Sequence, residues 1–290
     1  MLFRSVSLLV FIISLFLFSS ALYAGETYNR VMKDKIVKVG VLTDSIPNSF
    51  YNDKKELVGF EIDLAAAIAK KLGCKLKLVP LKKDNSRVTK VKNGSIDLSI
   101  ANMTHTRERD KEIDFSITYF LDGQRILAKK GKYKTWENFL GKRIATIKRT
   151  TTKENIKNML RQIGDDNCDN TIIPYESDAK CFEALKSGRV AGWTGDSSIL
   201  IGYAGKYPGE YEFVGGFMSK ESCAIGLQEN DSAWRDIINF SLQDIWQDGT
   251  FHSIYNKWYG PDTPHSYPFT NQFEIWKDLY DPKSSSHLPI

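Results

Sequence analysis

The chain has 290 residues, of which 42% are hydrophobic and 26% charged, and this is the composition of a soluble globular protein long enough for two units. The composition excludes a low-complexity or disordered body. The formal net charge is only +5, and the 40 Lys and Arg residues are spread without the basic stripe that nucleic-acid binding requires, so no nucleic-acid partner is expected.

Residues 1–24 have the features of a secretory signal peptide. Arg4 is their only charged residue, residues 6–18 are almost wholly apolar, and small residues follow. Cleavage after Ala21 and cleavage after Ala24 both fit this pattern. A membrane anchor is the competing interpretation, but a spanning helix needs about 20 apolar residues and this run is shorter. No cysteine lies near the cut, so we expect a periplasmic protein without a lipid anchor.

Strands and amphipathic helices alternate through most of the remaining chain. The first run predicts strands at 36–42, 75–78 and 96–100, with helices at 62–72 and 85–92 between them. The second run predicts strands at 143–147, 171–174 and 190–194, with helices at 152–163 and 178–187. Each β-α-β-α-β order predicts a parallel sheet flanked by helices, and therefore an α/β fold.

Two helical stripes of apolar side chains follow, at residues 234–245 and 251–258, and such stripes indicate core packing. After Gly260 the periodicity ends, and the remaining residues are rich in Pro, Ser and Asp with scattered aromatic side chains. We therefore predict an irregular C-terminal tail over residues 261–290, lying against the body of the protein.

The chain contains four cysteines, and export to an oxidising compartment would allow a disulfide. Four cysteines permit three complete pairings, among which the sequence cannot choose. Their spacing does not match zinc ligands, and the four histidines are scattered along the chain. We therefore expect neither a metal site nor a cofactor. The cysteines are Cys74, Cys168, Cys181 and Cys223.

Four segments carry motifs that belong together. In chain order they are residues 59–65 (GFEIDLA), residues 102–109 (NMTHTRER) followed by 114–116 (DFS), the threonines 150–152, and residues 188–190 (GRV) leading to Asp196. In this order they resemble the family 3 extracellular solute-binding proteins, the amino-acid receptors of binding-protein-dependent ABC importers. The resemblance covers about residues 36–260 and is closest to the glutamate/aspartate-type subgroup.

The resemblance implies a two-lobed periplasmic binding protein fold, in which each lobe is a β-sheet flanked by helices and the ligand lies between the lobes. The chain would cross between the lobes twice, near residues 123–127 and near residues 215–221. The expected organisation is a signal peptide at 1–24, lobe 1 at 25–124 plus 219–260, lobe 2 at 125–218, and the tail at 261–290.

A free amino acid has an α-carboxylate and an α-ammonium, and each needs a partner when it is buried. Arg109 follows a predicted parallel strand, at the edge where open α/β sheets bind ligands, and a guanidinium can hold both carboxylate oxygens. By resemblance, Arg109 holds the α-carboxylate, Thr104 contacts the charged ends of the ligand by its hydroxyl or backbone, and Asp196 pairs with the α-ammonium. The alternatives are a surface ion pair for Arg109 and a helix cap for Asp196.

The threonine run falls where a strand of the second unit passes into a helix. Its hydroxyls and N–H groups can hold the carboxylate from the second lobe, although simple helix capping is the alternative. The family usually has Gly where Arg149 stands, which blurs the match. Thr151 is therefore the first choice, before Thr150 and Thr152. Asn102, which begins the segment of Thr104, is also included in the predicted site.

The ligand side chain is harder to assign. Arg87 lies in a segment resembling the one that carries a side-chain-binding Arg in glutamate and aspartate receptors. Asp44 is a second anionic contact and Phe50 an aromatic wall. Leu42 stands where those receptors often have a basic residue. Asp178 is also included in the predicted site, at a position where those receptors carry His or Tyr. An acid there repels a ligand carboxylate unless the acid is protonated. Glutamate, aspartate and glutamine are the leading ligands.

The sequence thus predicts a monomeric periplasmic receptor that passes an amino acid to an ABC permease in the inner membrane. The alternative is a secreted enzyme on the same fold, such as a cyclohexadienyl or arogenate dehydratase, which needs a general acid facing the ligand. Asp178 is the only candidate for that acid, so we expect no catalysis. A sensor module would need a transmembrane segment and a signalling domain after residue 260, and we expect neither.

Overall fold

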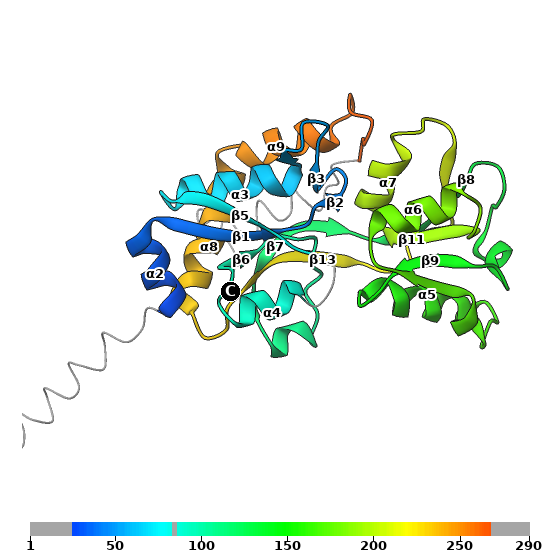
Figure 1. Cartoon of the computed structure of the whole chain (residues 1–290), viewed down its shortest axis with the longest axis horizontal. Coiled ribbons are helices and arrows are strands. Elements are labelled where there is room, and N and C mark those ends of the chain that lie inside the picture. The colour runs from blue at the N-terminus through cyan, green and yellow to red at the C-terminus, as the bar shows by residue number, and fades with distance from the viewer. Residues whose placement is uncertain (1–24, 83–85, 268–290) are drawn as a thin grey trace, which may run out of the picture.

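The computed structural model describes residues 25–82 and 86–267. It contains two five-stranded sheets and a small three-stranded sheet, and helices cover both faces of each larger sheet (Figure 1). The two larger sheets lie at opposite ends of the long axis and form two lobes (Figure 1). The predicted two-lobed α/β fold is therefore confirmed. The predicted signal peptide and residues 268–290 of the predicted tail lie outside the described residues.

The sheet of the first lobe has the strand order β5-β1-β6-β13-β7. Its inner strand β1 (Ile36–Val41) pairs in parallel with β5 (Lys75–Pro80) and β6 (Leu98–Ser99). The last two strands, β13 (Glu221–Leu227) and β7 (Asp114–Asp122), are antiparallel to each other, and β13 is antiparallel to β6. The three predicted strands are thus parallel, as expected, and the sequence analysis did not predict the antiparallel strands β7 and β13.

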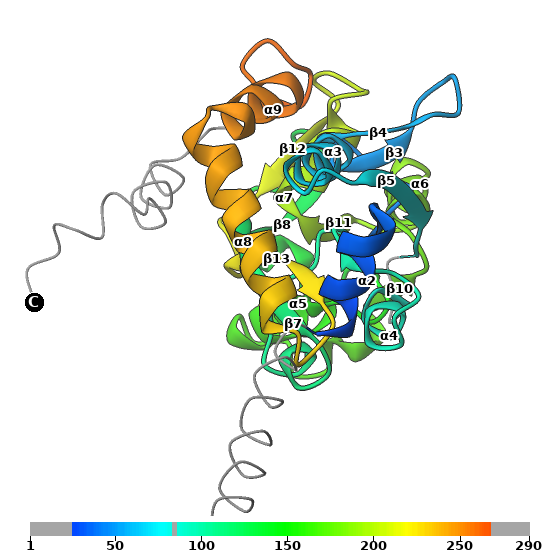
Figure 2. The same cartoon turned by 90° about the vertical axis from the view of Figure 1, so that its left-hand side faces the viewer.

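Helices cover the two faces of this sheet unequally. One face packs into a single apolar core with α2 (Glu26–Asp34), α3 (Phe60–Lys71), α8 (Ser232–Gln247) and α9 (Thr250–Tyr259). The short helix α4 (Ser86–Lys92) packs on a separate apolar cluster, on the side away from α8 (Figure 2). The apolar stripes predicted at residues 62–72, 234–245 and 251–258 are the buried faces of α3, α8 and α9.

The sheet of the second lobe has the order β10-β9-β11-β8-β12. The strands are β8 (Gln124–Lys129), β9 (Ile144–Ile147), β10 (Ile172–Tyr175), β11 (Gly192–Asp196) and β12 (Tyr211–Val214). Here β9, β10 and β11 are parallel, whereas β8 is antiparallel to its neighbours. One face is covered by α5 (Thr151–Gln162), and the other by α6 (Asp178–Lys186) and α7 (Ser197–Ala204) (Figure 1).

The chain passes from the first sheet to the second at Gly123, which alone separates β7 from β8, and it returns through residues 215–220 into β13. The two connections lie side by side, because Glu221 of β13 pairs with Asp122 of β7. The segment after α9 also reaches the first connection, where the Tyr267 hydroxyl donates to Asp122 Oδ1 at 3.3 Å. Tyr267, in the part of the tail that the structure describes, thus contacts the body of the protein.

The small sheet contacts the second lobe through the turn between its first two strands. It consists of β2 (Asp44–Ser45), β3 (Ser49–Tyr51) and β4 (Leu57–Val58). Ile46, in the turn between β2 and β3, is buried in the core of the second lobe. The Tyr203 hydroxyl of α7 donates to the carbonyl oxygen of Asp44 at 2.5 Å. Gly202 lies so close that a β-carbon there would be 1.9 Å from the carbonyl oxygen of Ile46.

The hinge also buries a carboxyl group. Asp122 is 9% exposed, and its oxygens accept hydrogen bonds from Gly123 N at 2.7 Å and Ser198 N at 3.2 Å. Burial first, and then the charge of Asp196, raise the pKa of Asp122 to about 7. All four cysteines are free thiols, and Cys168, Cys181 and Cys223 are buried.

We expect Gly202→Ala to destabilise the protein by roughly 1–3 kcal/mol, because the added methyl group collides with backbone rather than with a movable side chain. Urea unfolding of the variant measures this change. Gly216→Ala is the matched control, since no atom lies within 4 Å of the position that its β-carbon would take. Equal stability of the two variants would contradict the described packing of α7 on the β2–β3 turn.

We also expect the Asp122 carboxyl to make stability depend on pH. Its pKa is about 7 in the folded protein against 3.8 for an ordinary Asp, so the folded state holds an extra proton between these values. Stability therefore falls as pH rises through this window. Relative to Asp122→Asn, the wild type should lose roughly 1–3 kcal/mol between about pH 5 and pH 8 in urea titrations. Parallel pH profiles for the two proteins would contradict the assignment.

Candidate functional site

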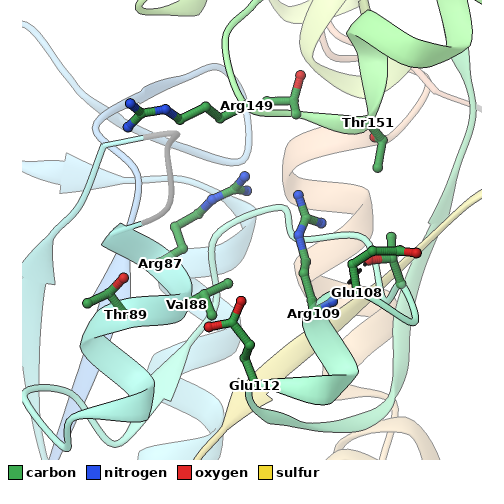
Figure 3. A pocket seen from close by; sticks show the side chains of 10 residues that line it. Arg87, Val88, Thr89, Glu108, Arg109, Glu112, Arg149 and Thr151 are labelled. Carbon is green, nitrogen blue, oxygen red and sulfur yellow. Dashed lines mark hydrogen bonds between the residues drawn. The ribbon is translucent and has the colours of Figure 1, made fainter.

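A cavity of about 310 Å³ lies between the two lobes. The first lobe contributes Arg87 of α4 and Arg109, and the second lobe contributes Arg149, Thr150 and Thr151 from the start of α5. Figure 3 shows the guanidinium groups of Arg87 and Arg109 pointing into this space from one side, with Arg149 and Thr151 on the other. The structure thus brings four predicted site residues together across the cleft.

Arg87 is only 2% exposed, although it carries a charge. Its Nη1 donates to the carbonyl oxygens of Ala101 at 2.9 Å and Asn102 at 3.2 Å. These bonds hold the guanidinium at the cavity and also fix the loop that follows β6. Burial first, and then the nearby charge of Arg109, lower the pKa of Arg87 to about 10, so the side chain stays cationic at neutral pH.

Arg109 begins the short 3-10 helix η2 (Arg109–Lys111). Its Nη1 donates to the carbonyl oxygen of Thr104 at 2.6 Å, which orients the guanidinium toward the cavity. Burial lowers the pKa of Arg109, while the charges of Asp196 and Glu221 partly offset this effect. The surface ion pair considered for Arg109 is therefore wrong, because the side chain turns inward. Two guanidinium groups around one cavity favour an anion there.

The threonines at the start of α5 have different surroundings. Thr150 is the N-cap residue but makes no side-chain cap, since its hydroxyl donates to the carbonyl oxygen of Ile147 at 3.0 Å. The Thr151 hydroxyl donates to Glu221 Oε2 at 3.2 Å and accepts from Gln124 Nε2 at 2.9 Å. Thr152 is buried and does not line the cavity. Among the three, Thr151 combines access to the cavity with contacts between the lobes.

Asp196 ends β11 and is 6% exposed. It makes no side-chain cap to α7, so the helix-cap interpretation is wrong. Its Oδ2 accepts from Asn102 Nδ2 at 2.6 Å, and its Oδ1 accepts from Gln124 Nε2 at 3.0 Å. Asn102 has a left-handed backbone, with φ of 45°, and belongs to the first lobe. Asp196 therefore forms a buried bond between the lobes.

Three further polar residues complete this network, and the sequence analysis did not identify them. Glu221 Oε2 accepts from the Thr104 hydroxyl at 2.6 Å as well as from Thr151. Asn155 Nδ2 joins Glu221 Oε1 at 3.0 Å to Gln124 Oε1 at 2.8 Å. No local pattern marks them, because Glu221 and Gln124 belong to strands that the periodicity did not predict.

Asn102, Thr104 and Asp196 belong to the network that Thr151 joins but do not line the cavity of Arg109, and the remaining predicted residues lie elsewhere. Asp44 lines a second cavity of about 490 Å³ between the lobes, together with Lys148, Arg149 and Lys180. Asp178 is 1% exposed and accepts from the Ser45 hydroxyl at 3.2 Å. Phe50 packs edge-on against Trp258, with 6.0 Å between ring centroids, rather than against either of these cavities. The ligand roles of these residues stay predictions.

Two searches cover only the residues that the structure describes. Within residues 25–82 and 86–267, no cluster of at least three His, Cys, Asp or Glu side chains is arranged to hold a metal ion. In the same ranges, no helix combines the length and the apolar character needed to cross a bilayer.

Several known proteins are similar to this chain. The glutamine-binding protein GlnH of a Bacillus subtilis ABC transporter is 36% identical over 234 residues, which span 79% of this chain and 82% of that protein. The glutamate/aspartate import solute-binding protein of Escherichia coli is 28% identical over 251 residues, spanning 83% and 82%.

Solved structures of amino-acid-binding proteins are also similar to this chain. An ancestral arginine-binding protein bound to glutamine has a TM-score of 0.71 at 33% identity, covering 78% of this chain and 98% of that one. The ancestral amino acid-binding protein AncCDT-1, a precursor of cyclohexadienyl dehydratase, has a TM-score of 0.71 at 30% identity, covering 79% and 98%. Residues 37–261 match the bacterial extracellular solute-binding proteins, family 3, and the chain belongs to this family.

Proposed function

We propose that this chain binds an acidic amino acid or its amide, namely glutamate, aspartate or glutamine, in the cavity between its lobes. The observation that carries the proposal is that Arg87 and Arg109 of the first lobe line the same cavity as Thr151 of the second. Glutamine and glutamate/aspartate are also the ligands in the names of the relatives at 36% and 28% identity.

The charged ends of the ligand would have separate partners. Arg109 would hold the α-carboxylate together with the hydroxyls of Thr104 and Thr151, which a shared acceptor already brings together. Asp196 would pair with the α-ammonium, because a buried ammonium needs an anionic partner. The ligand would thereby contact both lobes and favour their closed arrangement, since closure follows from the additional contacts made in that state.

The ligand side chain would lie near Arg87 and Arg149. Leu42, which replaces a basic residue of the glutamate and aspartate subgroup, is fully buried among apolar side chains and contributes no charge. Arg149 supplies a cation from the second lobe instead, and it lines both the 310 Å³ cavity and the 490 Å³ cavity. With Arg109 assigned to the α-carboxylate, Arg87 and Arg149 remain against Glu108 and Glu112, so the charges of the lining suit a side-chain amide as well as a second carboxylate.

The protein would act outside the cytoplasmic membrane. Export through residues 1–24, release without a lipid anchor and action as a monomer follow from the sequence analysis. The partner would be an ABC permease in the inner membrane that recognises the closed lobes. This transfer is the step for which the two-lobed fold is suited, because closure distinguishes the loaded receptor from the unloaded one.

An enzymatic role is the second candidate, favoured by the likeness to AncCDT-1, a precursor of cyclohexadienyl dehydratase. That reaction would need a general acid in reach of the substrate. Asp178, the candidate from the sequence, is 1% exposed and lines neither the cavity of Arg109 nor that of Asp44. The relatives at 36% and 28% identity are both named as binding proteins, and this favours transport over catalysis.

We expect refolded protein of residues 25–290 to bind one of the three amino acids in a one-to-one calorimetric titration against all twenty. Arg109→Ala should weaken the Kd at least about 100-fold, because it removes a buried, charge-assisted contact to the carboxylate. Arg107→Ala is the matched control, since Arg107 is exposed and lies outside the cavity lining. Silence for every amino acid, with turnover of prephenate or arogenate, would replace this proposal with the enzymatic one.

A further inference from the structure

Glu221 is a buried carboxylate that bridges the lobes at the candidate site. It starts β13 next to the second crossing and is 2% exposed. Its Oε2 accepts from the Thr104 hydroxyl of the first lobe at 2.6 Å and from the Thr151 hydroxyl of the second at 3.2 Å. Its Oε1 accepts from Ser219 at 2.5 Å and from Asn155 at 3.0 Å. The Glu221 carboxylate thus makes contacts of the kind expected of a ligand.

The two hydroxyls set a limit on what the site can hold at once. A threonine hydroxyl carries a single proton, so it donates to one acceptor at a time. Thr104 and Thr151 are the residues proposed above to hold the α-carboxylate, and both donate to Glu221. A ligand carboxylate can gain these two protons only if Glu221 gives them up.

The charges around Glu221 point in the same direction. Burial and the charge of Asp196 raise its pKa, which indicates an environment that already disfavours negative charge. A ligand carboxylate arriving near Thr104 and Thr151 would add a further negative charge, although Arg109 offsets part of the repulsion. Like charges this close cost free energy unless one of them moves away or takes up a proton.

The other end of the site has the same arrangement. Asn102 Nδ2 donates to Asp196 Oδ2 at 2.6 Å, from the first lobe to the second. Asp196 is the proposed partner of the ligand's α-ammonium, and the Asn102 amide already donates to one of its two carboxylate oxygens. Side chains of the protein itself therefore contact the groups proposed for both charged ends of the ligand.

We infer that Glu221 is an internal competitor for the ligand's α-carboxylate, which holds Thr104 and Thr151 together across the cleft and must release them when the amino acid binds. The inference rests on the proposed function. It makes Glu221 a residue that limits affinity, in contrast to Arg109 and Thr151, which provide it. A residue with a purely structural role at the hinge would have the opposite effect, because its loss would weaken binding.

The test is the Kd of Glu221→Gln for L-glutamate, L-aspartate and L-glutamine, measured by calorimetry on refolded residues 25–290. The amide keeps the size of the side chain but is a weaker acceptor, so binding should tighten about tenfold. Asp231→Asn is the matched control, because Asp231 is a buried carboxyl of the first lobe that caps α8 and lines neither cavity between the lobes. Its Kd should stay that of the wild type.

Weaker or unchanged binding by Glu221→Gln would overturn the inference, as would equal tightening by both variants, which would indicate a general effect of charge. If Glu221→Gln shows no cooperative thermal transition, Glu221→Asp decides instead. Its carboxylate is one methylene group shorter and should hold the two hydroxyls less well, so a lower Kd supports competition and an equal or higher Kd excludes it. A wild type that binds none of the twenty amino acids would overturn the proposed function itself, an outcome distinct from those above.

Discussion

Charged side chains that are buried between two lobes must find partners, because a charge removed from water without compensation costs several kcal/mol. Arg87, Asp196 and Glu221 are all less than 10% exposed. Each of the three makes hydrogen bonds to backbone or to neutral side chains. These hydrogen bonds offset part of the cost of burying the three charges.

The topology explains why these groups meet. Asp196 stands at the carboxyl end of a parallel strand, and Asn102 and Thr104 lie in the loop that follows another, which are the positions where open α/β sheets expose their loops. Glu221 and Gln124 belong instead to the antiparallel strands β13 and β8, which begin directly after the two crossings. The site therefore combines loop residues, which are common ligand contacts, with residues that begin the strands next to the crossings.

The sequence predicted the regular parts of the fold because periodicity reports burial. Helices with an apolar stripe, such as α3 and α8, and the short apolar strands were found with boundaries shifted by a few residues at most. The strands β7 and β13 were missed, since their pairing joins residues about 100 positions apart and no local pattern encodes it. In the site, Arg109, Thr151 and Asp196 came from motifs, whereas the role of Glu221 depends on that long-range pairing. Arg149 was noticed only as a departure from Gly, although it lines both cavities.

The segment that follows α9 has a mechanical consequence. The two connections between the lobes, at Gly123 and at residues 215–220, lie side by side and can act as a single hinge. Tyr267 adds an attachment at Asp122, and a β-carbon on Gly205 of the second lobe would be 2.2 Å from the carbonyl oxygen of Pro264. Any swing that carries Gly205 away from α9 must break this contact. The amplitude of opening is therefore limited by noncovalent contacts of the C-terminal segment as well as by the length of the linkers.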